Sequence, residues 1–372
     1  MNFSLSDEQV ELRSVVRRFL AERATESETR RLMATETGYD PAVWKQLSGQ
    51  LGLIGLAVPE EYGGAGFGWV ELGVVFEEMG RALLCAPYFA TVALAIPALL
   101  ASGDEEACAD LLPAVAAGER IATLALTEPA GRWDADGVTL RAEQHDGDWR
   151  LHGLKTYVPD GAVADLVLVV ARSEAGIGLF AVEGTAPGLT RRNLPTLDQT
   201  RKQAELRFDA VPARLIGRDG SGWPGVEEAL RRAAVALAAE QVGAAQRALD
   251  LAVEHAKVRT QFGRPIGSFQ AIKHMCSEML LEVESARSAA LYAMWAADSS
   301  PGELADAASL AQAFCTDALN SVVADCIQVH GGIGFTWEHP AHLYFKRASS
   351  SSFLLGDADH HRALFADRVL PA

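Results

Sequence analysis

Three long stretches in the last third of the chain constrain its fold more than any other feature of the sequence. Residues 226–258, 268–297 and 303–330 are rich in alanine, carry apolar residues at helical spacing and contain very few glycines or prolines. Alanine is the strongest helix former, and this spacing gives each helix a continuous apolar face. Because such faces are buried by packing against one another, the sequence predicts a bundle of long helices.

The residues before this bundle divide into a helical part and a β-rich part. Up to about residue 118 the apolar spacing is helical, most clearly in residues 42–51, 69–83 and 90–100. From 121 to 208 short runs rich in Val, Leu and Ile alternate with Gly, Pro and Asp turns, which predicts strands. A chain of 372 residues is also longer than one core usually supports, so we expect several compact units.

Charge and cysteine content exclude several classes of partner. A formal net charge of −16 repels phosphate backbones and anionic lipids, so neither nucleic acid nor a membrane is expected as a partner. The five cysteines are scattered and lack a CxxC spacing, which fits reduced thiols in a cytoplasmic protein. An acidic N-terminus does not match a secretory signal, and the apolar residues 88–101 are too few to span a bilayer. His339, His342, His360 and His361 lack metal-ligand spacing, so no metal is expected.

Two glycine-containing segments fit a dinucleotide. Residues 259–270 place a cation, amides and aromatic rings around a Gly-Arg-Pro turn, and a guanidinium offers a fork of donors to a pyrophosphate. Residues 328–335, Gln-Val-His-Gly-Gly-Ile-Gly-Phe, end a predicted helix with glycines that allow backbone to approach a ligand. Taken separately, the first segment is equally compatible with a solvated loop, and the second with an ordinary helix C-cap.

As a pair, these segments resemble the FAD-binding signatures of the acyl-CoA dehydrogenase family. Other segments match that family in order along the chain, namely residues 59–66 (Pro-Glu-Glu-Tyr-Gly-Gly-Ala-Gly), 126–130 (Leu-Thr-Glu-Pro-Ala) and 153–161 (Gly-Leu-Lys-Thr-Tyr-Val-Pro-Asp-Gly). The resemblance implies a mainly α, α+β fold of three domains, typically assembled as a tetramer and active in lipid metabolism. The expected domains are N-terminal α-helical (1–118), middle β-barrel (119–222) and C-terminal four-helix bundle (223–372).

The resemblance also assigns residues to the cofactor FAD. It implies that an adjacent subunit's FAD is contacted by Arg259, Gln261, Phe262, Gln270, Gln328 and Gly332. It places Thr127 beside the flavin, with Tyr157, Val158 and Pro159 lining the flavin ring. Family members commonly carry a hydroxyl residue near flavin N5 where this chain has Pro159, which offers neither a hydroxyl nor a backbone donor. Gly131-Arg132 likewise replaces the familiar Gly-Ser, so a common hydrogen bond to the acyl-CoA is not expected.

The family reaction needs a carboxylate that removes the α-proton of an acyl-CoA thioester. Leu355 stands where many members have this glutamate, and Ala233 occupies the position that other members use. Glu240 and Asp357 are weak substitutes. Glu240 is more simply interpreted as a buried residue bonded to a partner, and Asp357 as a helix cap or surface carboxylate.

Three functions follow from the resemblance. The leading hypothesis is FAD-dependent α,β-dehydrogenation of an acyl-CoA, in a homo- or hetero-oligomer with a related chain and with an electron-transfer flavoprotein as partner. The second is a non-catalytic structural subunit that completes a partner's flavin site. The third is a flavin oxidase or monooxygenase, which needs no acyl-CoA base.

Overall fold

The computed structural model describes residues 4–370, which form two compact units. Within the described residues, unit 1 comprises 4–29, 69–84 and 234–370, and unit 2 comprises Arg30–Gly68 and Cys85–Ala233. Both units are therefore built from segments that are separated in the sequence. The predicted division into three consecutive domains, with boundaries at residues 118 and 222, stays a prediction. The two units group residues that contact one another in space, whereas the predicted domains are consecutive stretches of sequence.

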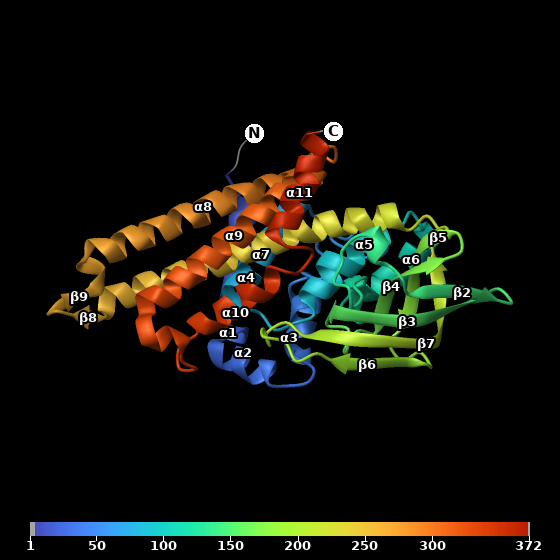
Figure 1. The fold of residues 1–372 in the computed structure, drawn as a ribbon, viewed down its shortest axis with the longest axis horizontal. Coiled ribbons are helices and arrows are strands. Elements are labelled where there is room, and N and C mark those ends of the chain that lie inside the picture. The colour runs from blue at the N-terminus through green and yellow to red at the C-terminus, as the bar shows by residue number, and fades with distance from the viewer. Residues whose placement is uncertain (1–3, 371–372) are drawn as a thin grey trace. The chain divides into compact units, whose positions relative to one another are not determined.

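Unit 1 is dominated by the long helices that the sequence predicts (Figure 1). They are α7 (Trp223–Val258, which begins in unit 2), α8 (Gln270–Ser299) and α9 (Leu304–His330). This confirms the prediction, with ends displaced by a few residues. The remaining elements are α1 (Asp7–Arg23), α4 (Trp69–Ala82), β8 (Thr260–Gln261), β9 (Arg264–Pro265), η5 (Ile266–Ser268), η6 (Gly331–Phe335), α10 (Ala341–Ser351) and α11 (Ala358–Val369).

Helices α4 and α7 approach each other at two glycines. A Cβ atom added to Gly80 would lie 1.9 Å from the carbonyl oxygen of Glu240, and one added to Gly243 would lie 1.7 Å from that of Glu77. No side chain fits into either space, so only glycine permits this helix separation. Because the backbones of α4 and α7 are in direct contact there, Glu77 on α4 and Glu240 on α7 are held at neighbouring positions of the two helices.

The helical part of unit 2 contains short elements. They are α3 (Pro41–Lys45), η1 (Gln46–Gln50), η2 (Glu60–Tyr62), η3 (Phe89–Ala95), α5 (Ile96–Leu100), α6 (Glu105–Ala116) and η4 (Ala135–Gly137), while α2 (Glu26–Met33) crosses from unit 1. Residues 42–51 and 90–100 are helical as predicted, but η1 and η3 are π-helical. Pro97 at the start of α5 has no N–H to donate, and the wider turns of η3 end there.

Seven strands form the middle of unit 2. They are β1 (Ala122–Ala125), β2 (Arg141–His145), β3 (Asp148–Pro159), β4 (Leu166–Ser173), β5 (Gly176–Glu183), β6 (Leu189–Asn193) and β7 (Gln203–Ile216). Pairing runs from β4 through β5, β7, β3 and β2 back to β4, which closes a barrel. Strand β1 adds in parallel to β4, and β6 adds to β7. The predicted β-barrel is thus confirmed, although its last strand continues beyond residue 208.

Among residues 4–370, none of the helices combines the length and the apolarity needed to cross a bilayer.

Candidate functional site

The two segments predicted to bind a dinucleotide lie together at one end of the unit 1 helices. His255 in the last turn of α7 precedes Arg259 by four residues, and His330 at the end of α9 follows Gln328 by two. The centroids of these two imidazole rings are 4.4 Å apart. Figure 1 shows the β8–β9 hairpin at this end of the bundle. Segments that are about sixty residues apart in sequence therefore share one surface.

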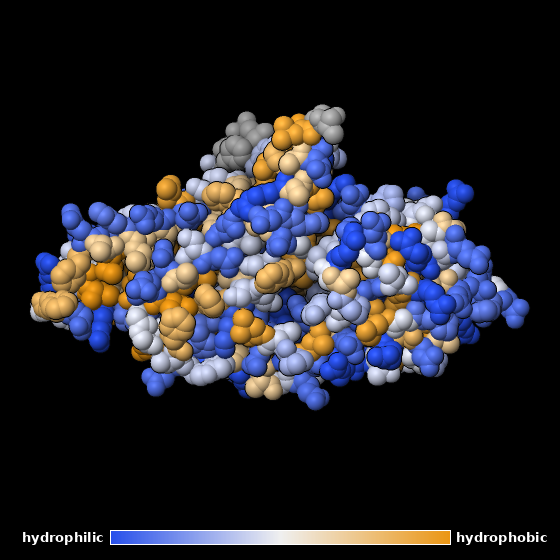
Figure 2. Space-filling view, in the orientation of Figure 1, coloured by the Kyte–Doolittle hydropathy of each residue, from blue (hydrophilic) through white to orange (hydrophobic). Residues whose placement is uncertain are grey.

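The first segment is an exposed hairpin. Strands β8 and β9 pair through Gln261 and Arg264, and the residues between them, Phe262 and Gly263, have φ values of 54° and 77°. Positive φ at both positions is the geometry of a tight two-residue hairpin, in which phenylalanine is strained and glycine is not. The Phe262 side chain is 92% exposed, which suits a residue that is covered in an assembly. Figure 2 shows other apolar residues gathered at the same end.

Every predicted contact residue of this hairpin region reaches solvent. Arg259, Gln261 and Gln270 are exposed, as is Gln328 on α9. The backbone of Arg259 is fixed, since its N–H donates to the carbonyl of His255 and its carbonyl accepts from Ile266. The guanidinium therefore extends from an ordered backbone toward the surface.

The second segment offers open backbone. No atom lies within 4 Å of a Cβ built on Gly331 or Gly332, and both residues are exposed. Backbone N–H groups that lack a neighbouring side chain can approach phosphate oxygens closely. Together with the cation of Arg259 and the ring of Phe262, this surface has the donors and the flat apolar face that the diphosphate and ring portions of FAD require.

A stack of three histidines joins the two segments. The His330 ring lies between those of His255 and His339, with centroid separations of 4.4 and 4.1 Å. His330 Nδ1 donates to the carbonyl of Cys326 at 2.7 Å. Burial lowers the pKa of all three histidines, that of His339 to about 4, and therefore favours their neutral forms. Sequence reasoning did not predict this cluster, although His330 lies within the second segment and His255 lies four residues before Arg259.

In unit 2, Thr127 is held rigidly at the end of β1. Its hydroxyl donates to the carbonyl of Thr156 at 2.6 Å. Lys155 donates from Nζ to the carbonyl of Leu126 and to Oε1 of Glu128, both at 2.8 Å, so it fixes the residues on either side of Thr127. Burial lowers the pKa of Lys155 to about 8. The predicted flavin-side residue therefore sits on a buried, hydrogen-bonded support.

The neighbouring residues of β3 do not offer the family's usual hydroxyl. The β3–β7 register shifts between Lys155 and Val158, and Tyr157 in this bulge has a φ of 55° and a half-exposed side chain. Val158 is buried, and Pro159 accepts a hydrogen bond at its carbonyl from Thr123 at 2.6 Å. Pro159 is therefore part of the barrel wall and has no donor to direct at a ligand.

Leu355 lies in the turn between α10 and α11 of unit 1. Its side chain is 4% exposed, its φ is 68°, and its carbonyl is 3.1 Å from Nε2 of His361. A left-handed conformation costs a residue with a Cβ roughly 1–2 kcal/mol. A buried apolar side chain in a strained backbone thus fills the position at which the family resemblance predicts a base.

The two substitute carboxylates are engaged in structural roles. Glu240 is buried, and its Oε1 lies 2.6 Å from Nη1 of Arg347 on α10, which is also buried. Asp357 is the N-cap of α11 and accepts from the backbone N–H of His360 at 2.8 Å. Ala233, the other alternative position, is a buried residue of α7.

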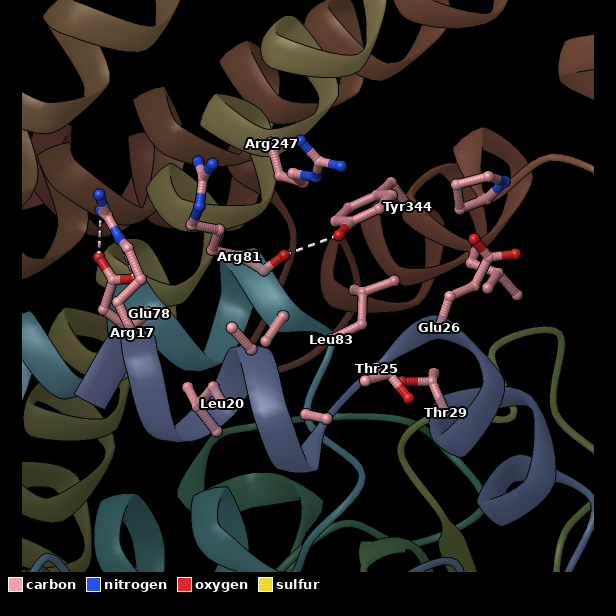
Figure 3. Close-up of a pocket in the computed structure, with 15 residues that line it drawn as sticks. Arg17, Leu20, Thr25, Glu26, Thr29, Glu78, Arg81, Leu83, Arg247 and Tyr344 are labelled. Carbon is pink, nitrogen blue, oxygen red and sulfur yellow. Dashed lines mark hydrogen bonds and ion pairs between the residues drawn. The ribbon is translucent and has the colours of Figure 1, made fainter. Parts of the chain in front are cut away.

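A pocket of ≈ 410 Å³ in unit 1 is lined by none of these residues (Figure 3). Its polar lining includes Arg17, paired with Glu78 at 2.6 Å, and Tyr344, whose hydroxyl donates to the carbonyl of Arg81 at 2.7 Å. Sequence reasoning did not find it, because its lining comes from separate helices without a shared motif.

The turn that carries Leu355 should be sensitive to acid. Burial lowers the pKa of His361 to about 4, from an ordinary value of 6.5. The unfolded chain therefore takes up a proton first, so the contribution of neutral His361 is complete above pH 6.5 and is lost as the pH falls toward 4. We expect His361→Gln to reduce the acid-induced loss of unfolding free energy by up to about 3 kcal/mol.

Urea unfolding of both proteins at pH 7 and pH 4.5 measures this difference. His274→Gln, the same change at an exposed histidine on α8, is the control and should not reduce the acid-induced loss. Equal acid sensitivity of His361→Gln and wild type would contradict the assignment.

Comparison with known proteins gives consistent matches over almost the whole chain. Family models described as acyl-CoA dehydrogenase N-terminal, middle and C-terminal domains match residues 6–119, 123–211 and 220–370. The chain is 36% identical to the acyl-CoA dehydrogenase IpdE2 of Mycolicibacterium smegmatis, over 95% of this chain and 96% of that protein.

Two solved structures have the same fold. A variant of the Tcur3481–Tcur3483 steroid ACAD is 35% identical, with a TM-score of 0.87 and 98% of each chain covered. The ChsE4–ChsE5 complex from Mycobacterium tuberculosis is 28% identical, with a TM-score of 0.90 and 100% of each chain covered.

Proposed function

Because this chain belongs to the acyl-CoA dehydrogenase family, a family of oxidoreductases, we propose that it is one subunit of a hetero-oligomeric, FAD-dependent acyl-CoA dehydrogenase. In this assembly it completes the FAD site of a related chain, and that chain supplies the catalytic carboxylate. The observation that carries the proposal is that this chain has residues suited to binding FAD but lacks residues suited to catalysis. The surface around Arg259 and Gln328 suits a dinucleotide, whereas Leu355 and Pro159 lack the groups that the reaction uses.

The contribution of this chain is binding and orientation. Arg259 would donate to the diphosphate of FAD, Phe262 would cover an apolar face, and the backbone at Gly332 would hold the adenosine portion. When bound, FAD would supply the acceptor for the hydride from the β-carbon of the acyl group. The α-proton goes to a carboxylate of the partner, because Leu355 cannot accept a proton and Glu240 is paired with Arg347.

Two solved relatives support a heteromeric assembly. Both the Tcur3481–Tcur3483 protein and the ChsE4–ChsE5 complex carry two chain names in their descriptions. The former is described as a steroid enzyme, so we further propose that the substrate is the CoA thioester of a steroid-derived acid. Comparing turnover of such a thioester with that of a straight-chain acyl-CoA tests this substrate class.

Co-expression tests the subunit role. We expect little flavin when this chain is produced alone, and close to one FAD per pair of unlike chains when it is produced with a glutamate-bearing family member. Acyl-CoA-dependent reduction of an electron acceptor should appear only in the mixed assembly. Full flavin loading and turnover by the chain alone would overturn the proposal.

The same experiment bears on the two other functions. A non-catalytic subunit that completes a partner's flavin site would be inactive alone, and activity that survives in a mixed assembly whose Arg259 and Gln328 no longer contact FAD would exclude that role. Oxygen consumption with peroxide release, without an acyl-CoA requirement, would favour the oxidase.

Restoring the missing glutamate should not create an active enzyme. We expect Leu355→Glu produced alone to remain at least tenfold slower than a glutamate-bearing homologue, because the buried turn is strained and Pro159 still offers no donor. Leu355→Gln, with similar size and no base, is the matched control. Steady-state rates for the two variants test this, and homologue-level turnover by Leu355→Glu would show that a single residue accounts for the lost activity.

A further inference from the structure

A second pocket in unit 1, of ≈ 290 Å³, lies between α1, α4, α7 and α8. Its walls are mainly apolar and include Val74 on α4, Val242 on α7, and Leu291 and Met294 on α8. It contains none of the residues assigned to FAD or to proton transfer. It therefore needs an explanation of its own.

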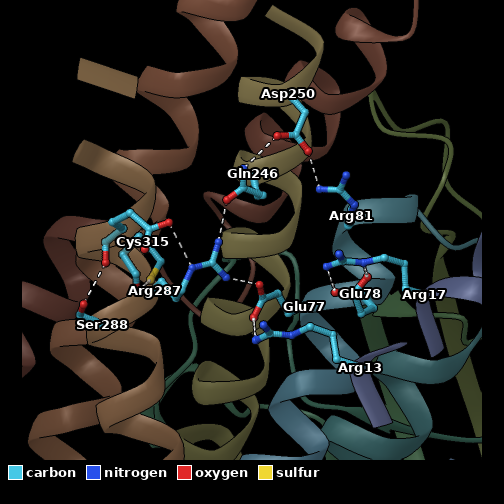
Figure 4. Close-up of polar contacts among 12 residues, drawn as sticks. Arg13, Arg17, Glu77, Glu78, Arg81, Gln246, Asp250, Arg287, Ser288 and Cys315 are labelled. Carbon is cyan, nitrogen blue, oxygen red and sulfur yellow. Dashed lines mark hydrogen bonds and ion pairs between the residues drawn. The ribbon is translucent and has the colours of Figure 1, made fainter. Parts of the chain in front are cut away.

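The polar side of this pocket holds two guanidinium groups and one carboxylate. Arg13 on α1 and Arg287 on α8 both face Glu77 on α4, which is buried (Figure 4). These three lining groups sum to one positive charge. The pocket thus combines an apolar interior with a local cationic excess, in a chain whose formal net charge is −16.

The two arginines are not equally satisfied. Arg287 binds Glu77 through Nη1, donates from Nη2 to Oε1 of Gln246 at 2.7 Å, and has Nε 3.5 Å from Oε1 of Glu284. Arg13 has only its Nη2 near Glu77 Oε2, at the long distance of 3.5 Å. Its Nε is buried and has no acceptor among the residues that the structure describes. A charged donor without an acceptor is costly in a buried position.

We propose that this pocket binds a small aliphatic carboxylate whose head group pairs with Arg13. A carboxylate presents two oxygens in the plane that matches the Nε–Nη edge of a guanidinium, and its single negative charge balances the excess in the pocket. The aliphatic body packs between Val74, Val242 and Met294. A volume near 300 Å³ lies at the lower end of the range of small-molecule sites, which limits the ligand to a short or medium chain.

Other occupants fit less well. An inorganic anion would leave the apolar walls without contact. A phosphate would bring more negative charge than is needed to balance the single positive charge of the lining groups. A fatty alcohol would fill the apolar part but would bring no negative charge to the Nε–H of Arg13. The ligand therefore needs both a carboxylate and an aliphatic chain. Octanoate is a suitable probe, and octanol is its uncharged counterpart.

Calorimetric titration of octanoate into the purified protein, together with its cofactor and any subunit that accompanies it, tests the proposal. We expect saturable binding of octanoate, at least tenfold weaker binding to Arg13→Gln, and little binding of octanol. Arg18→Gln is the matched control, because it removes the same charge from an exposed position on the same helix and should bind like wild type.

Several outcomes would overturn the inference. Octanoate affinity that is equal in Arg13→Gln and wild type would place the ligand elsewhere, as would competition by acyl-CoA at the thioester site. Absence of binding at millimolar octanoate would show that the pocket does not take this class. If Arg13→Gln fails to fold, Ala290→Leu, which narrows the same pocket, should weaken octanoate binding instead.

Discussion

Replacing Arg259 with glutamine should lower the FAD content of the co-purified hetero-oligomer at least tenfold. The guanidinium is exposed on an ordered backbone beside Phe262 and the open glycines of η6, and a charge-assisted pair with a diphosphate contributes more than a neutral hydrogen bond. Glutamine keeps the polarity and much of the length but removes the charge and the fork of donors. Flavin absorbance per mole of protein after gel filtration measures the loss.

Lys257→Gln provides the control for this experiment. Lys257 is exposed, lies two residues before Arg259 and carries the same charge, so its replacement changes the local potential equally. We expect Lys257→Gln to retain its FAD. The Arg259→Gln subunit must also elute with its partner, since loss of the assembly would remove the cofactor for a different reason. Normal FAD content in an intact Arg259→Gln assembly would disprove the proposed contact.

Breaking the Glu240–Arg347 pair should produce the largest loss of stability. Both side chains are buried and their closest atoms are 2.6 Å apart. Removing one member of a buried ion pair leaves an uncompensated charge and typically costs about 3–5 kcal/mol, whereas replacing both with apolar residues often costs little. We therefore expect Arg347→Met to be strongly destabilised and the double variant Glu240→Leu with Arg347→Met to recover most of that loss.

Urea unfolding of the single and double variants measures this non-additivity. The same set tests the catalytic alternative for Glu240. If Glu240 were the base, Glu240→Gln would abolish turnover in the mixed assembly with little change in stability. We expect the opposite result, with unfolding shifted to lower urea and turnover retained by the molecules that remain folded.

The long helices and the barrel were predictable because their signals are local. Helical spacing over 226–258, 268–297 and 303–330 persists for many turns, and the apolar run in β4 is bounded by turn residues. The π-helical turns η1 and η3 were not predictable, since their apolar spacing resembles that of an α-helix over so few residues. The bulge at Tyr157 was also hidden, because register depends on the partner strand β7.

The candidate site shows a similar limit. The Arg259 and Gln328 segments could be paired from the sequence only through a family resemblance. In the structure their proximity is shown by the contact between the rings of His255 and His330, which no sequence pattern predicts. The partner of Glu240 lies more than one hundred residues away, so its identity required the fold. The pocket beside Arg13 depends on four helices at once. Charge and periodicity in the sequence indicate which side chains depart from the expected pattern, but they do not show which side chains contact one another in the fold.

The interleaved segments of unit 1 impose an order on its folding during synthesis. Helices α1 and α4 leave the ribosome early, but their remaining contacts in this unit begin at Ala234. At about 5–20 residues per second, the 150 positions between Leu84 and Ala234 delay those contacts by roughly 8 to 30 s. During that time Glu77 and Glu78 lack the helices that later cover them. The last residue of unit 2, Ala233, is synthesised before the final segment of unit 1 begins. The barrel can therefore fold before the helical unit closes, and nascent α1 and α4 are the segments most in need of chaperone protection.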